Sequence, residues 1–126
     1  MSDEPIVLAR SGGREYDLGS MRGVFKADGP ETGDRYCVSE WFVAPRGSGP
    51  GPHRHEANEE LFLVTEGTMT FLVGADWIEA PAGTFLRIPA GVTHDFANRT
   101  DTRAAAFNVF IPGGFEAPFS AGFAAR

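Results

Sequence analysis

The side chains best suited to chemistry gather in one stretch, residues 47–67 (GSGPGPHRHEANEELFLVTEG). His53 and His55, two of only three histidines in the chain, lie there one residue apart. Because residues i and i+2 of an extended chain point to the same face, their imidazoles should lie side by side. A turn and a following strand can bring a carboxylate, from Glu59 or Glu60, to the same point. Two imidazoles and a carboxylate are typical ligands of a first-row transition metal ion.

A second stretch, GTFLRIPAGVTHDFAN, holds the third histidine, His94. Pro89 and Gly91 fit the second and last positions of a type I turn, which separates one strand from the next. His94 opens that next strand, and Phe96 and Asn98 share its face. The spacing therefore predicts an imidazole that projects beside an aromatic ring and an amide.

Short apolar runs separated by turns rich in Gly and Pro are spread along the chain, with almost no helical periodicity. The expected strands cover residues 6–9, 16–18, 23–26, 35–44, 59–66, 68–73, 76–79, 84–88, 93–98 and 103–111. This pattern is typical of an all-β sandwich or barrel. A stiff loop over residues 45–52 delivers His53 to the site in a fixed direction. Phe115, Phe119 and Phe123 are spaced four apart, which fits either one face of a helix or a loosely packed tail.

The length of 126 residues fits a single domain, residues 1–126, that can bury a real core. We divide it into an N-terminal strand arm (1–29), a barrel core (30–112) and a C-terminal tail (113–126). The arm carries short apolar strands that have no obvious partner within a small barrel. Because open edge strands invite pairing with another chain, we expect a symmetric homodimer with the arm at its interface.

Composition excludes several classes of partner. A net charge of −6 and a pI of about 4.9 argue against binding to nucleic acid or to an anionic membrane surface. The single cysteine, Cys37, lies in an apolar run, so we expect a buried, inert thiol and no internal disulfide. No charged-then-apolar leader and no apolar run long enough to span a bilayer is visible, so we expect a cytoplasmic location.

The two chemical stretches resemble the two motifs of the cupin superfamily. The first motif, G-x5-H-x-H-x4-E-x6-G, is matched by Gly47, His53, His55, Glu60 and Gly67. The second motif, G-x5-P-x-G-x2-H-x3-N, is matched by Gly83, Pro89, Gly91, His94 and Asn98. The ending over residues 112–116 (PGGFE) is similar to that of small single-domain cupins related to quercetin dioxygenase.

The resemblance implies a cupin-type double-stranded β-helix, a jelly-roll barrel with one divalent transition metal ion (Fe, Mn, Ni, Cu or Zn) at its centre. The implied metal ligands are His53, His55, Glu60 and His94. The motif thus selects Glu60, and strand alternation then turns Glu59 to the opposite face, toward solvent. For the substrate pocket we predict Phe62 and Phe96, which share faces with Glu60 and His94, together with Asn98.

Three classes of function fit such a site. The first is a metal-dependent dioxygenase that acts on a small neutral or aromatic molecule, and we favour it. The second is a metal-dependent isomerase or decarboxylase, for which Glu40, Tyr36 and Arg87 are the available acid–base candidates. The third is a non-catalytic cupin that binds a small molecule. The chain offers no cluster of basic residues for a phosphorylated sugar, which favours an uncharged substrate.

Overall fold

The computed structural model describes residues 4–120, which form nine strands and two short helices. In chain order these are β1 (Arg14–Asp17), β2 (Met21–Ala27), α1 (Gly29–Thr32), β3 (Cys37–Val43), β4 (Glu59–Glu66), β5 (Thr68–Val73), β6 (Asp76–Pro81), β7 (Phe85–Ile88), β8 (His94–Ala97), β9 (Ala104–Ile111) and α2 (Ala117–Ser120). From β3 onward the strands lie where Gly and Pro turns predicted them. No helix in this part of the chain is long and apolar enough to cross a membrane.

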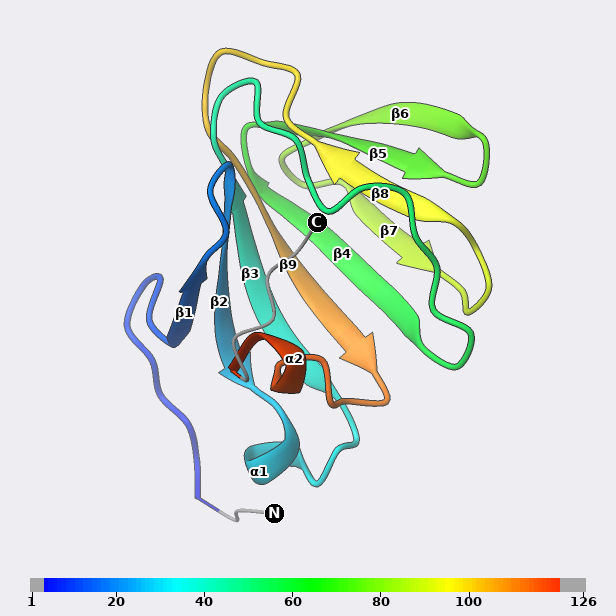
Figure 1. The fold of residues 1–126 in the computed structure, drawn as a ribbon. Helices are drawn as coiled ribbons and strands as arrows, with labels where there is room; N and C mark the ends of the chain where they lie inside the picture. Colours follow the sequence, from blue (N-terminus) through cyan, green and yellow to red (C-terminus); the bar gives the residue numbers. More distant parts are fainter. Residues whose placement is uncertain (1–3, 121–126) are drawn as a thin grey trace.

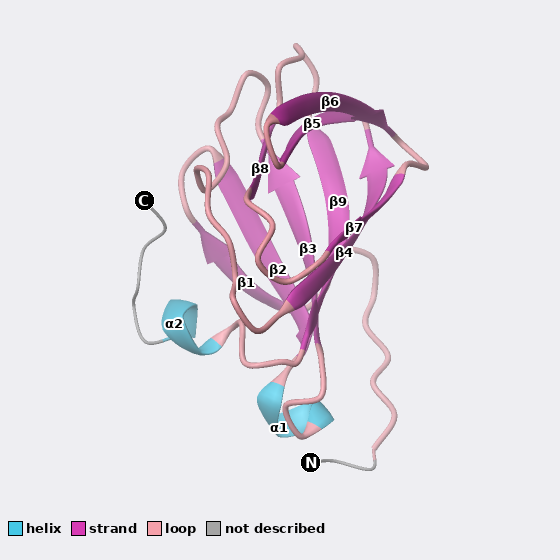
Figure 2. Cartoon of the chain, turned by 90° about the vertical axis from the view of Figure 1, so that its right-hand side faces the viewer, coloured by secondary structure: helices cyan, strands magenta, loops and turns pink. Residues whose placement is uncertain are grey.

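The strands form two antiparallel sheets that curve around a common interior (Figures 1 and 2). The larger sheet has the order β1-β2-β3-β9-β4-β7, and the smaller has the order β6-β5-β8. The last strand, β9, is thus inserted between β3 and β4, which are consecutive in sequence. The predicted all-β jelly-roll barrel, a double-stranded β-helix, is confirmed.

Strand alternation fills the interior with aromatic side chains. Along β3, β9 and β4 every second residue faces inward, and the register places Ser39, Asn108 and Phe62 next to one another. Phe71 of β5 and Phe96 of β8 approach from the smaller sheet, with ring centroids 5.0 Å and 6.0 Å from that of Phe62. One apolar core therefore joins the two sheets.

The loop between β3 and β4 runs along the free edge of β8 and carries two of the three histidines. His53 and His94 exchange backbone hydrogen bonds of 3.0 and 2.8 Å, which form an isolated antiparallel bridge. The expected extended segment is therefore a docked loop with isolated bridges, not a regular strand. An added Cβ at Gly49 would fall on the carbonyl oxygen of Phe96, so glycine allows this close approach.

The N-terminal region differs from the expectation in two places. Residues 6–9 form no strand, and Ile6, Val7 and Leu8 are exposed by 47%, 92% and 44%. Residues 29–32 form α1, although the sequence there shows almost no helical periodicity. Glu31 accepts a hydrogen bond of 3.0 Å from the backbone N–H of Asp28 and so stabilises the first turn.

The C-terminal segment is held against the N-terminal strands by a buried carboxylate, Glu116. Arg14 donates to it from Nε and Nη2 at 2.7 and 2.9 Å, and the Tyr16 hydroxyl donates at 2.7 Å. The carboxylate of Asp28 accepts the backbone N–H groups of Gly114 and Glu116 at 2.7 and 2.8 Å. We call Arg14, Tyr16, Asp28 and Glu116 the clasp.

The clasp brings two phenylalanines of the tail onto the core. The Phe119 ring lies 5.7 Å from that of Phe25 and 5.9 Å from that of Trp41, and Phe115 stacks on Phe110 at 4.5 Å. The tail is therefore packed as far as residue 120, with a single turn of helix. Phe123, the third phenylalanine of the series, lies outside the described residues.

We predict that Glu116→Gln lowers the free energy of unfolding by about 1–2 kcal/mol, because the variant loses charge-assisted hydrogen bonds from Arg14 and Tyr16. Urea denaturation measures the change. The control is Glu15→Gln, whose carboxylate makes an exposed 3.1 Å pair with Arg22 and should contribute less than about 0.5 kcal/mol. Equal effects of the two substitutions would contradict the role assigned to the clasp.

Candidate metal centre

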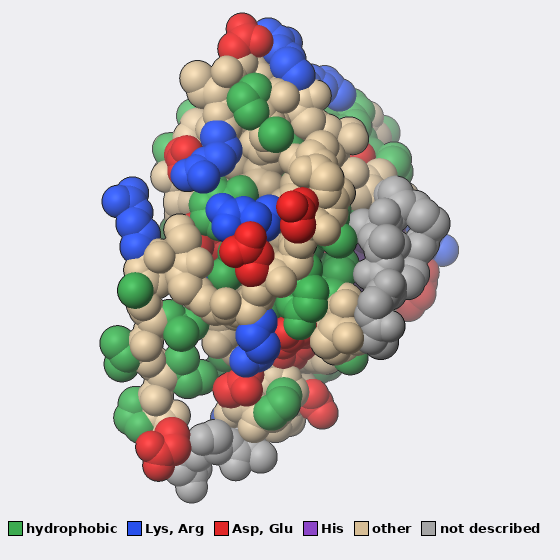
Figure 3. All heavy atoms as spheres, turned by 60° about the vertical axis from the view of Figure 1, so that its left-hand side comes forward, with side chains coloured by type: hydrophobic (Ala, Val, Ile, Leu, Met, Phe, Trp, Pro, Cys, Tyr) green, Lys and Arg blue, Asp and Glu red, His purple; other side chains and the backbone are tan. Residues whose placement is uncertain are grey.

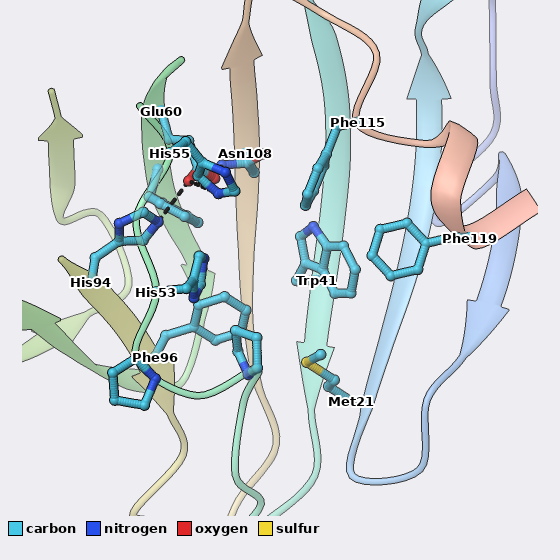
Figure 4. Close-up of a pocket in the computed structure, with 13 residues that line it drawn as sticks. Met21, Trp41, His53, His55, Glu60, His94, Phe96, Asn108, Phe115 and Phe119 are labelled. Carbon is cyan, nitrogen blue, oxygen red and sulfur yellow. Dashed lines mark hydrogen bonds and ion pairs between the residues drawn. The ribbon is translucent and has the colours of Figure 1, made fainter. Parts of the chain in front are cut away.

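His53, His55, Glu60 and His94 converge on one point inside the barrel (Figure 4). Each offers one ligand atom, and these atoms all lie within 4.8 Å of one another. Two of the imidazoles come from the β3–β4 loop, the carboxylate from β4 and the third imidazole from β8. The structure thus brings together the four side chains that the motifs select.

Backbone carbonyl groups orient two of the three imidazoles. His53 Nδ1 lies 2.7 Å from the carbonyl oxygen of Gly51, and His94 Nδ1 lies 3.0 Å from that of Val92. Because a carbonyl oxygen only accepts, each Nδ1 carries a proton and donates it. Each ring therefore turns its Nε2 toward the other candidate ligands, and it is this nitrogen that binds a metal ion once it carries no proton.

The Glu60 carboxylate is buried and sits among the imidazoles. Its Oε2 lies 2.6 Å from His94 Nε2 and 3.2 Å from His55 Nε2. Burial alone would raise the pKa of Glu60, but the neighbouring His55 and His94 outweigh it and lower this pKa to about 2. Burial would likewise lower the pKa of His94, yet its contact with Glu60 raises it. Within this buried pair the contact therefore favours the ionised carboxylate and the protonated imidazole.

The neighbouring Glu59 occupies the opposite face of β4. Its Oε2 lies 3.5 Å from Nη2 of Arg87, and both side chains are substantially exposed. The one-residue offset between Glu59 and Glu60 thus decides which carboxylate enters the barrel, as strand alternation predicts.

The four side chains fit a divalent transition metal ion. His55 Nε2 is buried and makes no hydrogen bond to any of residues 4–120, although it points toward Glu60. A ligated ion would satisfy this nitrogen and replace the proton on His94. Imidazole nitrogens with one carboxylate oxygen suit iron, manganese, nickel, copper and zinc alike.

A cavity of about 430 Å³ opens beside the four side chains, and aromatic groups dominate its wall. Its lining consists of Met21, Trp41, Pro50, Pro52, His53, His55, Glu60, Phe62, His94, Phe96, Asn108, Phe115 and Phe119. Trp41, Phe115 and Phe119 lie across the cavity from the imidazoles (Figure 4). No lysine or arginine among residues 4–120 lines this cavity.

Of the three pocket residues predicted from sequence, Phe62 and Phe96 line the cavity and Asn98 does not. The Asn98 side chain is buried in the turn after β8, where Nδ2 donates to the carbonyl oxygens of Val43 and Thr102 at 3.1 and 2.7 Å. Its Oδ1 accepts the backbone N–H of Thr100 at 3.0 Å. Asn98 follows the last residue of β8, so its amide serves the turn and not the site.

Sequence reasoning missed the rest of the wall. Trp41 and Met21 reach the cavity from β3 and β2, and nothing in their local pattern distinguishes them from ordinary core residues. Asn108 could have been identified from the sequence, because it is a polar residue at an inward position of the otherwise apolar strand AAAFNVFI. The four-residue spacing of Phe115 and Phe119 was visible in the sequence, but it did not show that both side chains line this cavity.

We predict that metal affinity rises about tenfold per pH unit while His94 is protonated and levels off above its raised pKa, because one proton must leave for each ion bound. Competition with a chelator, using Zn²⁺ as the probe at several pH values, measures this pH dependence.

We also predict that Glu60→Gln weakens Zn²⁺ binding sharply, since it removes both a ligand and the anion that pairs with His94. Glu59→Gln is the matched control and should bind as the wild type does. A larger loss in Glu59→Gln than in Glu60→Gln would contradict this assignment of the two carboxylates.

Several solved structures share this architecture. KdgF from Halomonas sp. is 13% identical over 86% of this chain and 94% of its own, with a TM-score of 0.74. An RmlC-like cupin from Shewanella frigidimarina NCIMB 400 is 16% identical over 89% of this chain and 94% of its own, also with a TM-score of 0.74.

A third similar structure has a higher sequence identity. The polyketide cyclase RemF from Streptomyces resistomycificus is 29% identical over 78% of this chain and 69% of its own, with a TM-score of 0.66. No protein of curated function matches the sequence. A family model described as a cupin domain matches residues 39–110, which include all four converging side chains. The chain therefore belongs to the cupin family.

Proposed function

We propose that this protein is a metal-dependent enzyme, a dioxygenase, that acts on a small, neutral, aromatic molecule able to chelate the metal. The observation that carries the proposal is the position of the His and Glu group at one side of an aromatic cavity that no Lys or Arg of residues 4–120 lines. The proposed ligands are His53, His55, Glu60 and His94.

The cavity supports the choice of substrate class. A volume of about 430 Å³ is within the range of small-molecule sites and suits a compact ring system. Aromatic walls bind flat rings by stacking and edge-to-face contacts. A phosphate or carboxylate far from the metal would find no cationic side chain to pair with in the described part of this wall.

Three neutral imidazoles and one carboxylate leave a divalent ion with a net positive charge. Such an ion supplies Lewis acidity and redox chemistry, and dioxygenation would place both atoms of O2 in the substrate without a separate reductant. The protein side chains hold the ion, orient the ring against Phe62, Phe96 and Trp41, and exclude water from the reacting face.

A second candidate is a non-oxidative cyclisation or isomerisation, and the likeness to the polyketide cyclase RemF favours it. This chemistry needs an acid or base besides the metal ligands. The candidates named from sequence lie elsewhere: Glu40 pairs with Lys26 at 3.2 Å, Arg87 faces Glu59, and Tyr36 is exposed. None of the three lines the cavity, which supports the oxidative reading.

Oxygen consumption tests the proposal. Protein loaded separately with Fe²⁺, Mn²⁺, Ni²⁺, Cu²⁺ and Zn²⁺ is mixed under air with catechol-type and flavonol-type compounds, and with sugar phosphates as the comparison class. We expect uptake of O2 with an aromatic chelator and a redox-active metal, at least 100-fold reduced in His94→Ala. Conversion of an aromatic substrate without O2 uptake would favour the cyclase reading. Binding without conversion of any probe would favour a non-catalytic cupin.

We also propose that the protein forms a symmetric homodimer. β1 lies at the edge of the larger sheet, and the exposed Ile6, Val7 and Leu8 precede it. On the face that Figure 3 shows, basic and acidic side chains are interspersed with apolar ones and form no continuous basic patch. A homodimer is thus a better fit for this surface than a nucleic acid. The cytoplasmic location stays a prediction.

Light scattering at micromolar concentration tests the dimer. We expect twice the chain mass for the wild type and a shift toward the single-chain mass when Ile6→Asp and Leu8→Asp are combined, because the charges would be buried at the interface. Lys26→Gln, outside the exposed apolar segment, serves as the control. A wild-type monomer would contradict the proposal.

A further inference from the structure

Among residues 4–120, Asn108 is the one side chain with a polar amide that lines the cavity, and it is not one of the proposed metal ligands. It lies in the middle of β9, faces inward between Ser39 and Phe62 of the neighbouring strands, and is 1% exposed. It lines the cavity beside Glu60 (Figure 4). A buried amide in a wall of phenylalanines requires hydrogen-bond partners for both of its ends.

The amide nitrogen of Asn108 has its partners. Nδ2 donates to Glu60 Oε1 at 2.9 Å and approaches the carbonyl oxygen of Leu61 at 3.5 Å. The carbonyl oxygen of Leu61 can only accept a hydrogen bond. The nitrogen must therefore be the end that faces β4, and the orientation of the amide is determined.

The amide oxygen, Asn108 Oδ1, is buried and has no hydrogen-bond partner among residues 4–120. The nearby indole of Trp41 is already engaged, because its Nε1–H donates to Ser39 Oγ at 2.9 Å. An acceptor that the described residues leave unpaired, in a wall that is mostly aromatic and apolar, matches a ligand that brings a donor.

We propose that Asn108 determines specificity: Oδ1 accepts a hydrogen bond from a ring hydroxyl of the substrate, next to the oxygen atoms that bind the metal. The inference rests on the proposed function, because it assumes an aromatic chelator in this cavity. It narrows the substrate class to polyhydroxylated aromatic molecules that carry a free O–H beside the chelating pair. A methyl ether at that position would leave Oδ1 unpaired and add bulk against it.

A pair of probes separates this hydrogen bond from chelation. Pyrogallol and 3-methoxycatechol both offer two adjacent hydroxyls to the metal, and they differ in whether the third oxygen carries a hydrogen. Binding is measured without oxygen in the zinc-loaded protein by quenching of Trp41 fluorescence. A Trp77→Phe background removes the chain's second tryptophan, which lies outside the cavity under Arg99. We expect the wild type to prefer pyrogallol about tenfold.

The preference should vanish in Asn108→Leu, which keeps the volume of the side chain and removes the acceptor. Phe62→Leu is the control variant: it should weaken both probes and keep their ratio. Zinc content is measured in each variant, because a residue that only oriented Glu60 would change metal content or both affinities together. A wild-type ratio retained in Asn108→Leu would overturn the assignment of Asn108 alone. Failure of the wild type to bind either probe would overturn the aromatic substrate class, and the assignment with it.

Discussion

The buried carboxylate of Glu60 is the constraint on which the site depends. A carboxylate that is 3% exposed inside a phenylalanine-rich barrel is stable only if neighbouring groups compensate its charge and its lone pairs. Here an imidazole at 2.6 Å, a second imidazole at 3.2 Å and an amide at 2.9 Å surround it. The groups that compensate the buried carboxylate without a metal therefore include the imidazole nitrogen atoms that a divalent ion needs.

The positions of these groups are determined by backbone pairing and not by the side chains themselves. The loop that carries His53 and His55 is attached to the edge of β8, and carbonyl oxygens of Gly51 and Val92 hold two of the rings. Side chains oriented in this way lose little freedom when an ion binds, so the site is preorganised. The backbone at Gly49 passes close to the carbonyl oxygen of Phe96, which fits a segment, residues 45–52, that is mostly glycine and proline.

The metal-ligand set and the cavity wall carry different information about function. Three imidazoles and a carboxylate are compatible with several ions and with several reactions, so the family alone does not define the chemistry. The wall is more selective, because its aromatic rings come from both sheets and from the clasped tail, and a flat, uncharged molecule would suit the space beside them. The hydrogen bond proposed for Asn108 would add one directional contact to that apolar surface. The ligand group and the wall would thus govern different properties, the reaction and the choice of substrate.

The sequence by itself determined the sheet-forming runs and the turns between them, because period-two alternation and turn residues are local properties. The convergence of His53, His55, Glu60 and His94 was implied by the resemblance to the two cupin motifs, and the structure brings these four side chains together. The sequence also separated Glu60 from Glu59 once the motif was applied. Only the tertiary structure showed that Asn98 serves a turn, that Asn108 faces the cavity, and that Phe115 and Phe119 close it. Those roles depend on contacts between β9, β3 and the two ends of the chain, such as Glu116 with Arg14, which are 102 residues apart. Local sequence patterns do not predict such contacts, because the contacts arise from the order of strands in the folded sheet.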